Sequence, residues 1–263
     1  FAFTGNKFEF RMLGASSSIS LTNTIINTSV AESLRLYADE IEARLGKEAL
    51  ADIVHDLIKR TIEEHGRIIF NGNGYDDAWI KEATEQRGLL NLRTTPDAMP
   101  TLLEKKNVDM LTGLKIFTKA ELESRYEIMM ENYVKTVTIE AQTMLDMTRK
   151  EILPAVAGYT KELTETLAAK RAILPSLPAK YETGTITKLS SLLDQIDAAA
   201  DELEKTTLQI KAIDSVTESA FQIRDAMLPR MAALRVVCDE AEPLTSERFW
   251  PFPTYDKLLF GVR

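Results

Sequence analysis

Three charged residues at alternate positions, Lys7, Glu9 and Arg11, are the side chains of this sequence best placed to do chemistry together. They alternate with Phe8 and Phe10, and a period of two is typical of a strand that buries one face. On the charged face a carboxylate lies between two cations. Such a row can hold a metal ion beside a phosphate, because carboxylate oxygens suit hard divalent cations and Lys or Arg suits phosphate. The spacing alone better fits an edge strand with solvated charges.

Other residue types that often carry chemistry are less well placed. His55 and His65 lie ten positions apart, whereas a helical metal site needs two histidines four apart, so we expect solvated or capping side chains. Cys238 is the single cysteine, and we expect a small apolar helix residue there rather than a nucleophile. Residues 71–74 form two Asn-Gly pairs, which predict a tight turn with positive φ; a backbone anion site is the weaker alternative.

Composition narrows the class of protein. The 263 residues are 44% hydrophobic and 27% charged, enough for a sizeable core in one or two domains. The net charge of −8 argues against a nucleic-acid partner, because phosphate binding needs a basic surface. One cysteine excludes an internal disulfide framework and fits a reducing compartment. The sequence has no apolar run of membrane-span length and no signal-peptide pattern. We therefore expect a soluble cytoplasmic protein with no membrane partner.

The elements that must position the charged strand are helices. An apolar repeat of three and four residues predicts a core-facing helix from about residue 25 to Gly46. Its expected core positions are Ile26, Val30, Leu34, Tyr37, Ile41 and Leu45. A second helix is expected over 48–64.

The next segment contains strong turn and capping residues. Asp76 or Asp77 is expected to cap a third helix, which Gly88 closes. The proline-containing stretch 89–100 predicts an extended loop, with a helix start at Thr101.

From Thr118 onward the pattern is that of long helices. Thr118 and Glu121 have the spacing of a capping box. Helical periodicity then continues for roughly fifty residues, with Pro154 expected to kink or divide the helix. Eight positions that step by three and four from Ile186 to Ile210 hold seven apolar residues, which predicts a coiled-coil-like seam in a second long helix from about residue 185.

A third long helix, over 216–240 with a kink at Pro229, would complete an antiparallel bundle. The predicted fold class is therefore mainly α. The tail, Phe-Trp-Pro-Phe-Pro-Thr-Tyr at 249–255, is too aromatic for a linker. We expect it to dock on this bundle or on a neighbouring subunit.

Three stretches together resemble the glutamine synthetase family, in particular its large bacterial type III members. They are Phe-Ala-Phe-Thr-Gly-Asn-Lys-Phe-Glu-Phe-Arg at 1–11, Arg-Ile-Ile-Phe-Asn-Gly-Asn-Gly-Tyr at 67–75 and Arg-Tyr-Glu-Ile-Met at 125–129. That family has an Arg/Lys-x-Glu-x-Arg strand before a Ser-rich loop. Smaller relatives end soon after a stretch like 116–118, whereas this chain continues through long helices, as type III enzymes do. The resemblance covers essentially the whole chain.

The resemblance implies that residues 1–150 are the end of an α+β catalytic domain, with one active-site strand at the N-terminus. Residues 151–263 would be a type III-specific helical extension with an aromatic tail. It implies a ligase that makes glutamine from glutamate, ammonia and ATP through a γ-glutamyl phosphate, with Mg²⁺ or Mn²⁺. By position, Glu9 would ligate metal and Arg11 would contact glutamate or the transferring phosphoryl group. Lys7, where many relatives carry Arg, would contact nucleotide phosphate.

The resemblance also implies a homo-oligomer, a large and usually double-layered ring. The family's other metal ligands, its nucleotide site and its N-terminal domain would lie upstream of residue 1, so we expect a C-terminal portion that is inactive alone. The alternative is a non-catalytic helical scaffold or oligomerisation module, in which Glu9 and Arg11 form only a surface ion pair.

Overall fold

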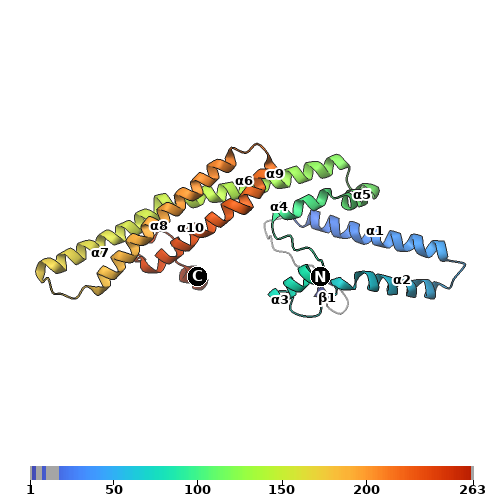
Figure 1. Ribbon diagram of the computed structural model, residues 1–263, viewed down its shortest axis with the longest axis horizontal. Coiled ribbons are helices and arrows are strands. Elements are labelled where there is room, and N and C mark those ends of the chain that lie inside the picture. Colours follow the sequence, from blue (N-terminus) through green and yellow to red (C-terminus); the bar gives the residue numbers. More distant parts are fainter. Residues whose placement is uncertain (1, 4–7, 10–17, 262–263) are drawn as a thin grey trace. The chain divides into compact units, whose positions relative to one another are not determined.

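The computed structural model describes residues 2–3, 8–9 and 18–261 and is mainly helical (Figure 1). The fold class predicted from the sequence is confirmed to that extent. The chain forms two compact units: unit 1 is Phe1–Leu92 with Thr101–Glu123, and unit 2 is Arg93–Pro100 with Ser124–Arg263. Within the described ranges, no helix has the length and apolar character needed to cross a membrane.

Unit 1 opens with a two-stranded antiparallel sheet and continues as helices. Its elements are β1 (Ala2–Phe3), β2 (Phe8–Glu9), α1 (Ser20–Arg44), α2 (Leu50–His65), a 3-10 turn (Gly66–Ile68), α3 (Asp77–Lys81), a π-turn (Glu82–Gln86) and α5 (Lys105–Gly113). Asp76 caps α3 by accepting a hydrogen bond from the Ala78 amide. Gly46 and Gly88 have φ of +89° and +61°, which glycine adopts without a steric cost. The helix ends predicted at these two glycines are therefore confirmed.

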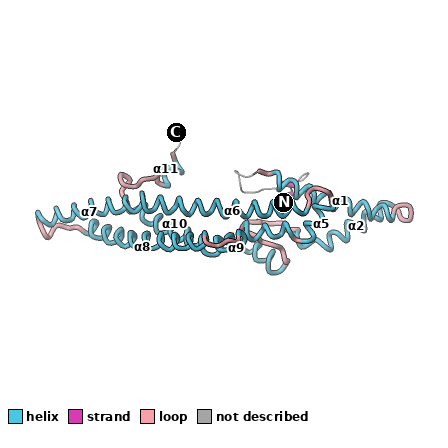
Figure 2. The backbone as a smooth tube through the Cα atoms, turned by 90° about the horizontal axis from the view of Figure 1, so that it is seen from above, coloured by secondary structure: helices cyan, strands magenta, loops and turns pink. Residues whose placement is uncertain are grey.

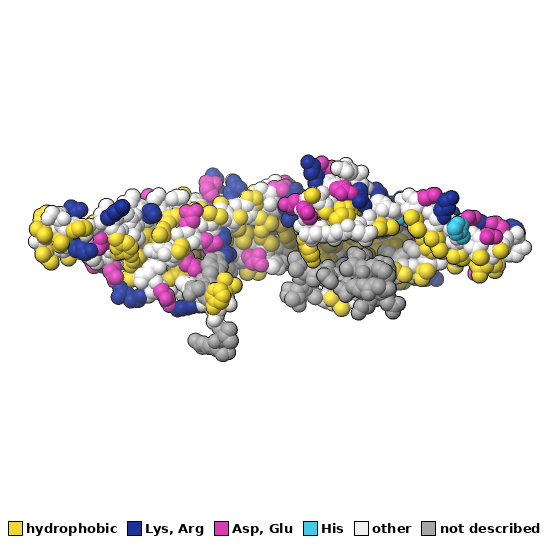
Figure 3. All heavy atoms as spheres, turned by 90° about the horizontal axis from the view of Figure 1, so that it is seen from below, with side chains coloured by type: hydrophobic (Ala, Val, Ile, Leu, Met, Phe, Trp, Pro, Cys, Tyr) yellow, Lys and Arg dark blue, Asp and Glu magenta, His cyan; other side chains and the backbone are white. Residues whose placement is uncertain are grey.

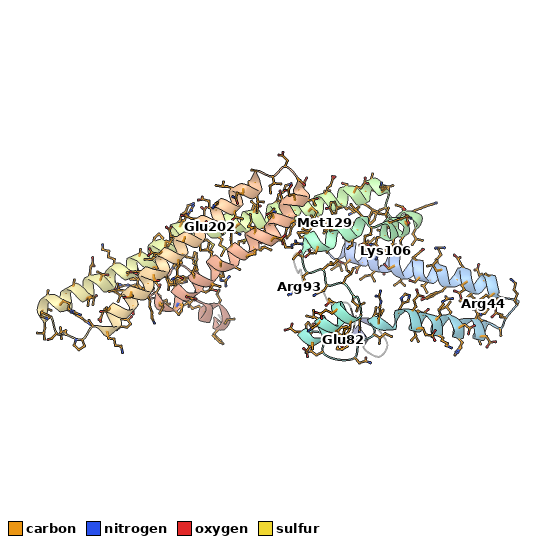
Figure 4. The ribbon with its side chains drawn as sticks, in the orientation of Figure 1. Arg44, Glu82, Arg93, Lys106, Met129 and Glu202 are labelled. Carbon is orange, nitrogen blue, oxygen red and sulfur yellow. The ribbon has the colours of Figure 1, made fainter. Side chains whose placement is uncertain are left out.

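Polar pairs link the two helices of the α1–α2 hairpin. Arg60 pairs with Glu40 at 2.5 Å, and the Tyr37 hydroxyl lies 3.4 Å from the Thr61 hydroxyl. At the end of the hairpin Arg44, labelled in Figure 4, pairs with Glu48 at 2.5 Å and with Asp56 at 2.9 Å. Exposed ion pairs of this kind add little stability, so they fix the hairpin geometry more than they hold it folded.

The apolar face predicted for α1 is only partly buried. Val30, Leu34 and Leu45 are 53%, 62% and 55% exposed. The prediction that these three residues face a core is wrong within the described chain, whereas the other three predicted positions, Ile26, Tyr37 and Ile41, are half-buried. The residue of α1 that is buried is Thr28, whose hydroxyl donates to the Thr24 carbonyl at 2.6 Å.

A short helix begins earlier than predicted. The Thr94 hydroxyl accepts a hydrogen bond from the Asp97 amide, Pro96 lies in the first turn, and α4 spans Thr95–Ala98 before a 3-10 turn, Met99–Leu103. The predicted loop is confirmed for residues 89–94, but its continuation to residue 100 and the helix start at Thr101 are wrong. Thr-x-x-Asp with a proline in the first turn is itself a helix-start signal.

Unit 2 is a bundle of long helices. Besides α4, it contains most of α6 (Lys119–Met147), then a π-turn (Thr148–Ile152), α7 (Leu153–Ile173), α8 (Lys180–Lys211), α9 (Val216–Gln222), a second π-turn (Ile223–Met227), α10 (Leu228–Ala241), a 3-10 turn (Glu242–Leu244) and α11 (Tyr255–Phe260). Helix α8 lies beside α7 and α10 (Figures 1 and 2). The prediction of at least three long packed helices is confirmed, although α8 begins before residue 185.

The predicted capping box is present at the start of α6. The Thr118 amide donates to Glu121 at 2.7 Å, and the Glu121 amide donates to the Thr118 hydroxyl at 3.3 Å. Two amides at the helix start are thereby satisfied, as this motif requires.

The heptad seam of α8 is the core of the bundle. Of its eight positions, Ile186 and Leu193 are partly buried, and the other six are buried: Leu189, Ile196, Ala200, Leu203, Thr207 and Ile210. The polar member, Thr207, donates its hydroxyl to the Leu203 carbonyl at 2.8 Å, so its burial leaves that donor satisfied. The predicted seam is confirmed.

The two prolines expected to disturb the long helices each follow a π-turn. Pro154 and Pro229 lie in the first turns of α7 and α10, directly after the two π-turns of unit 2. Proline lacks an amide hydrogen and its ring clashes with the carbonyl four residues earlier. A π-turn bonds residues five apart and so relieves that clash. The disturbance predicted at each proline is therefore a local change of helix type.

The aromatic tail docks on the bundle of its own chain. Phe249, Trp250 and Phe252 pack against the core of unit 2, and the Phe249 ring centroid lies 5.6 Å from that of Tyr159. A Cβ at Gly158 would lie 3.2 Å from the Phe249 ring, so the absent side chain gives the tail its close approach. The first of the two predicted docking alternatives is observed for this part of the tail.

Two leucines on α8 test the seam directly. Leu203 is fully buried, whereas Leu208 is 62% exposed. Leu203→Ala should lower the free energy of unfolding of the bundle by about 2–5 kcal/mol, because it leaves a cavity. Leu208→Ala should change it by less than about 0.5 kcal/mol. Hydrogen exchange of the α8 amides measures both, and equal losses would contradict the assignment of the seam.

Candidate functional site

The predicted metal-binding strand lies in a short antiparallel pair. Glu9 pairs with Ala2, and Phe8 pairs with Phe3. The Glu9 backbone is therefore in the extended conformation that the alternating pattern predicted. Lys7 and Arg11 lie outside the described residues, so the alignment of the three charged side chains stays a prediction.

A divalent ion such as Mg²⁺ or Mn²⁺ needs several oxygen ligands. Glu9 offers a suitable donor, a carboxylate, but it is one ligand. Among the residues that the structure describes, no three His, Cys, Asp or Glu side chains gather into a group that could hold a metal. The described residues thus fit part of a ligand set, and further ligands would have to come from outside them.

The two histidines and the cysteine lie where the sequence predicted non-catalytic side chains. His55 and His65 are exposed on α2. Cys238 is buried, and burial raises the pKa of its thiol to about 11. The thiolate is the nucleophilic form, so at neutral pH Cys238 is an inert core residue.

The segment that carries the Asn-Gly block is held by Arg87. Its guanidinium donates to the carbonyls of Arg67 and Ile69 at 3.1 and 2.8 Å. It also pairs with Glu82 at 2.6 Å and lies 4.8 Å from the Trp79 ring centroid; Figure 4 labels Glu82 on this segment. The planar, five-donor guanidinium suits such a hub. Neither the sequence pattern nor the resemblance had indicated this role.

The glycine of the first Asn-Gly pair is needed for space. Trp79 and Phe70 stack with their centroids 3.8 Å apart, and a Cβ at Gly72 would lie 2.6 Å from the Phe70 ring. Neither Gly72 nor Gly74 has a positive φ. The predicted reason for the turn, positive φ, is therefore wrong, because it is the stacked ring that excludes a side chain.

A side-chain cluster that the sequence reasoning missed joins the start of α4 to the π-turn after α9. Arg224 pairs with Asp97 and, at 2.6 Å, with Asp225. The Thr94 hydroxyl, 2.5 Å from Asp97, and the Arg224 guanidinium together hold the pKa of Asp97 below its usual value. The cluster fastens residues 93–100 to the bundle, and all its carboxylates are engaged by these partners. Its Thr-x-x-Asp half was readable from the sequence, but no local pattern predicts a partner 127 positions away.

Comparison with known proteins gives one consistent family. Residues 53–171 match the glutamine synthetase C-terminal domain family. A glutamine synthetase of Butyrivibrio fibrisolvens is 35% identical over 263 residues, which is 100% of this chain and 37% of that protein. A type-3 glutamine synthetase of Dictyostelium discoideum is 32% identical over 267 residues, covering 99% of this chain and 36% of its own length.

A glutamine synthetase of Bacteroides fragilis is 28% identical over 270 residues, again with 99% of this chain and 36% of the relative covered. The chain thus spans little more than a third of the length of the curated relatives that it matches. The matched region takes in at least 99% of this chain, including the strand of Glu9. The chain belongs to the glutamine synthetase family, and residues 53–171 match its C-terminal domain.

Proposed function

We propose that this chain supplies one active-site strand and the C-terminal helices of an enzyme that joins ammonia to glutamate with ATP, through a γ-glutamyl phosphate. The observation that carries the proposal is the similarity to a glutamine synthetase along the entire chain, 35% over 263 residues. Residues 1–150 would belong to the catalytic domain and 151–263 to a helical extension. The reaction would serve glutamine biosynthesis and nitrogen metabolism in the cytoplasm. The chain alone would be inactive, because the described residues offer only part of a metal site.

The three charged residues would have separate roles. Bound ATP and Mg²⁺ or Mn²⁺ supply the phosphoryl group and neutralise its charge. The Glu9 carboxylate would bind metal, and a carboxylate flanked by cations stays ionised for that purpose. Arg11 would hold glutamate or the phosphoryl oxygens with its planar fork, and Lys7 would contact nucleotide phosphate. The pairing of β2 with β1 supports this assignment, because a site on a paired strand is more precise than one on a loop.

An assembly role for unit 2 is supported by its exposed tail end. Leu258, Leu259 and Phe260 of α11 are 66%, 73% and 79% exposed, although the preceding aromatic residues are packed. Consecutive exposed apolar side chains of this kind mark contact surfaces. We propose that this tip contacts another subunit in a large ring-shaped homo-oligomer.

Two deletions from the full-length protein separate assembly from packing. Removing 255–263 should give smaller assemblies in sedimentation, with the stability of the bundle unchanged, because the packed Phe249, Trp250 and Phe252 remain. Removing 247–263 is the contrasting variant. It should also cost the bundle on the order of 3 kcal/mol, since partly buried aromatic side chains that pack against the core are lost. Unchanged assembly size after the shorter deletion would show that the tip is no subunit contact.

The proposed chemistry is tested by two substitutions in the full-length enzyme. Glu9→Gln keeps the shape but removes the charge that a hard cation needs. It should raise the metal concentration required for glutamine formation and be partly rescued by excess Mg²⁺ or Mn²⁺. Arg11→Lys should lower turnover by about a hundred- to a thousandfold without moving the metal dependence, because an ammonium cannot replace the planar fork.

The matched control is Glu42→Gln, which removes an exposed carboxylate on α1 and should leave activity and metal dependence unchanged. Steady-state glutamine formation across a metal titration measures all three variants. Near-normal activity of both Glu9→Gln and Arg11→Lys would return Glu9 and Arg11 to the role of solvated charges on an edge strand.

A further inference from the structure

The chain passes between the two units at three places, and all three lie close to contacts with α9 or with the π-turn after it. The crossings fall between residues 92 and 93, 100 and 101, and 123 and 124. Residues 93–100, which we call the strap, therefore belong to unit 2, although unit 1 continues from both of their ends. The third crossing lies inside α6.

The strap is anchored on unit 2 by a charged pair. Asp97 pairs with Arg224 of the π-turn after α9, and the Thr94 hydroxyl lies 2.5 Å from the Asp97 carboxylate. The guanidinium of Arg224 also pairs with Asp225 at 2.6 Å and lies 4.8 Å from the centroid of the Phe221 ring. Arg224 is thus held on its own side of the contact and fixes the position of Asp97.

This pair differs from the exposed ion pairs of the bundle. The two signs of charge are interspersed over the face shown in Figure 3, and exposed pairs within one helical stretch, such as Lys150 with Asp146, add little stability. The side chains of Asp97 and Arg224 are only 28% and 29% exposed. Charges that are shielded from water attract each other more strongly, so this pair is the firmer restraint.

The third crossing is fastened to the same part of the bundle. The hydroxyl of Tyr126, on α6, lies 3.1 Å from the hydroxyl of Thr217, on α9, and the two helices lie side by side in Figures 1 and 2. Helix α9 and its π-turn are themselves rooted in unit 2, because Ala220, Ile223 and Met227 are fully buried. A rigid element therefore holds the chain near every crossing.

We propose that α9 and the π-turn after it form a clamp through which the bundle restrains unit 1. A segment that is joined to unit 1 at both ends and pinned to the bundle in its middle transmits movement of either unit to the other. Movements between compact units are absorbed by a few residues at the ends of elements, and the clamp holds those residues. It thereby links the bundle to the unit that carries Glu9. The proposal does not depend on the proposed reaction.

Hydrogen exchange in the full-length protein tests the clamp, with Arg224→Gln and Arg149→Gln as a matched pair. Both arginines lie on π-turns of unit 2, and each pairs with two carboxylates, which for Arg149 are those of Asp201 and Glu204 on α8. Arg224→Gln should speed exchange of the strap and of α5 in unit 1 at least about fivefold, because losing a charged hydrogen bond favours local opening. Arg149→Gln should change neither segment.

The amides of the α8 seam are the internal reference and should exchange at the same rate in the Arg224→Gln and unsubstituted proteins. Faster exchange confined to the strap shows a local contact without transmission to unit 1 and overturns the proposal. Equal acceleration of α8 shows global destabilisation and overturns it too, as does unchanged exchange throughout. If Arg224→Gln does not fold, Asp97→Asn removes the charge from the other side of the pair and is measured in its place.

Two tyrosines of α6 test the contact at the third crossing. Tyr126→Phe removes the hydroxyl that meets Thr217, whereas Tyr133→Phe removes a buried hydroxyl that has no hydrogen-bond partner among the described residues. Tyr126→Phe should speed exchange of residues 119–126 about two- to tenfold, as expected for one neutral hydrogen bond. Tyr133→Phe should leave these amides unchanged. Equal effects of the two substitutions would overturn the role of α9 at this crossing.

Discussion

Unit 2 depends on the burial of one continuous apolar seam on α8. That helix has no proline and runs without interruption from Lys180 to Lys211, while α7 and α10 pack along it. Pro154 and Pro229 lie in these partner helices, each after a π-turn that also contacts α8. An uninterrupted helix with a heptad seam can pack against neighbours whose own hydrogen-bond pattern shifts, as long as their apolar residues still reach the seam. The changes of helix type in the bundle are thus in the helices that pack against α8, and not in α8 itself.

The predictions that succeeded rest on local periodicity. The seam, the capping box at Thr118 and the glycine helix ends each depend on residues within a few turns, so the sequence pattern carries them. The predictions that failed depend on what lies opposite. Whether Val30 or Leu34 is buried is decided by a neighbour, and the Asp97–Arg224 pair joins residues 127 positions apart. Gly72 illustrates the same point, because its requirement comes from the ring of Phe70 stacked on Trp79.

The sequence identified Lys7, Glu9 and Arg11 as a candidate metal and phosphate site but did not distinguish that site from a row of solvated charges. Alternation predicted the strand, and the pairing of Glu9 with Ala2 agrees, but the spacing of the three charges by itself fits a solvated edge strand better than a metal site. A metal site is defined by how many ligands converge on it, and convergence is a property of the whole fold. The functional proposal therefore rests on the sequence similarity to glutamine synthetases, which extends along the entire chain. The spacing of Lys7, Glu9 and Arg11 only indicates which residues to test.

The two units place different demands on the rest of the protein. Unit 2 buries its own seam and packs its own aromatic tail, so its geometry is specified within the chain. Unit 1 leaves much of its apolar surface exposed, so its geometry depends on contacts that the described residues do not supply. The strand of Glu9 belongs to unit 1. The geometry of that strand therefore depends more on contacts from outside the described residues than the geometry of the α8 seam does.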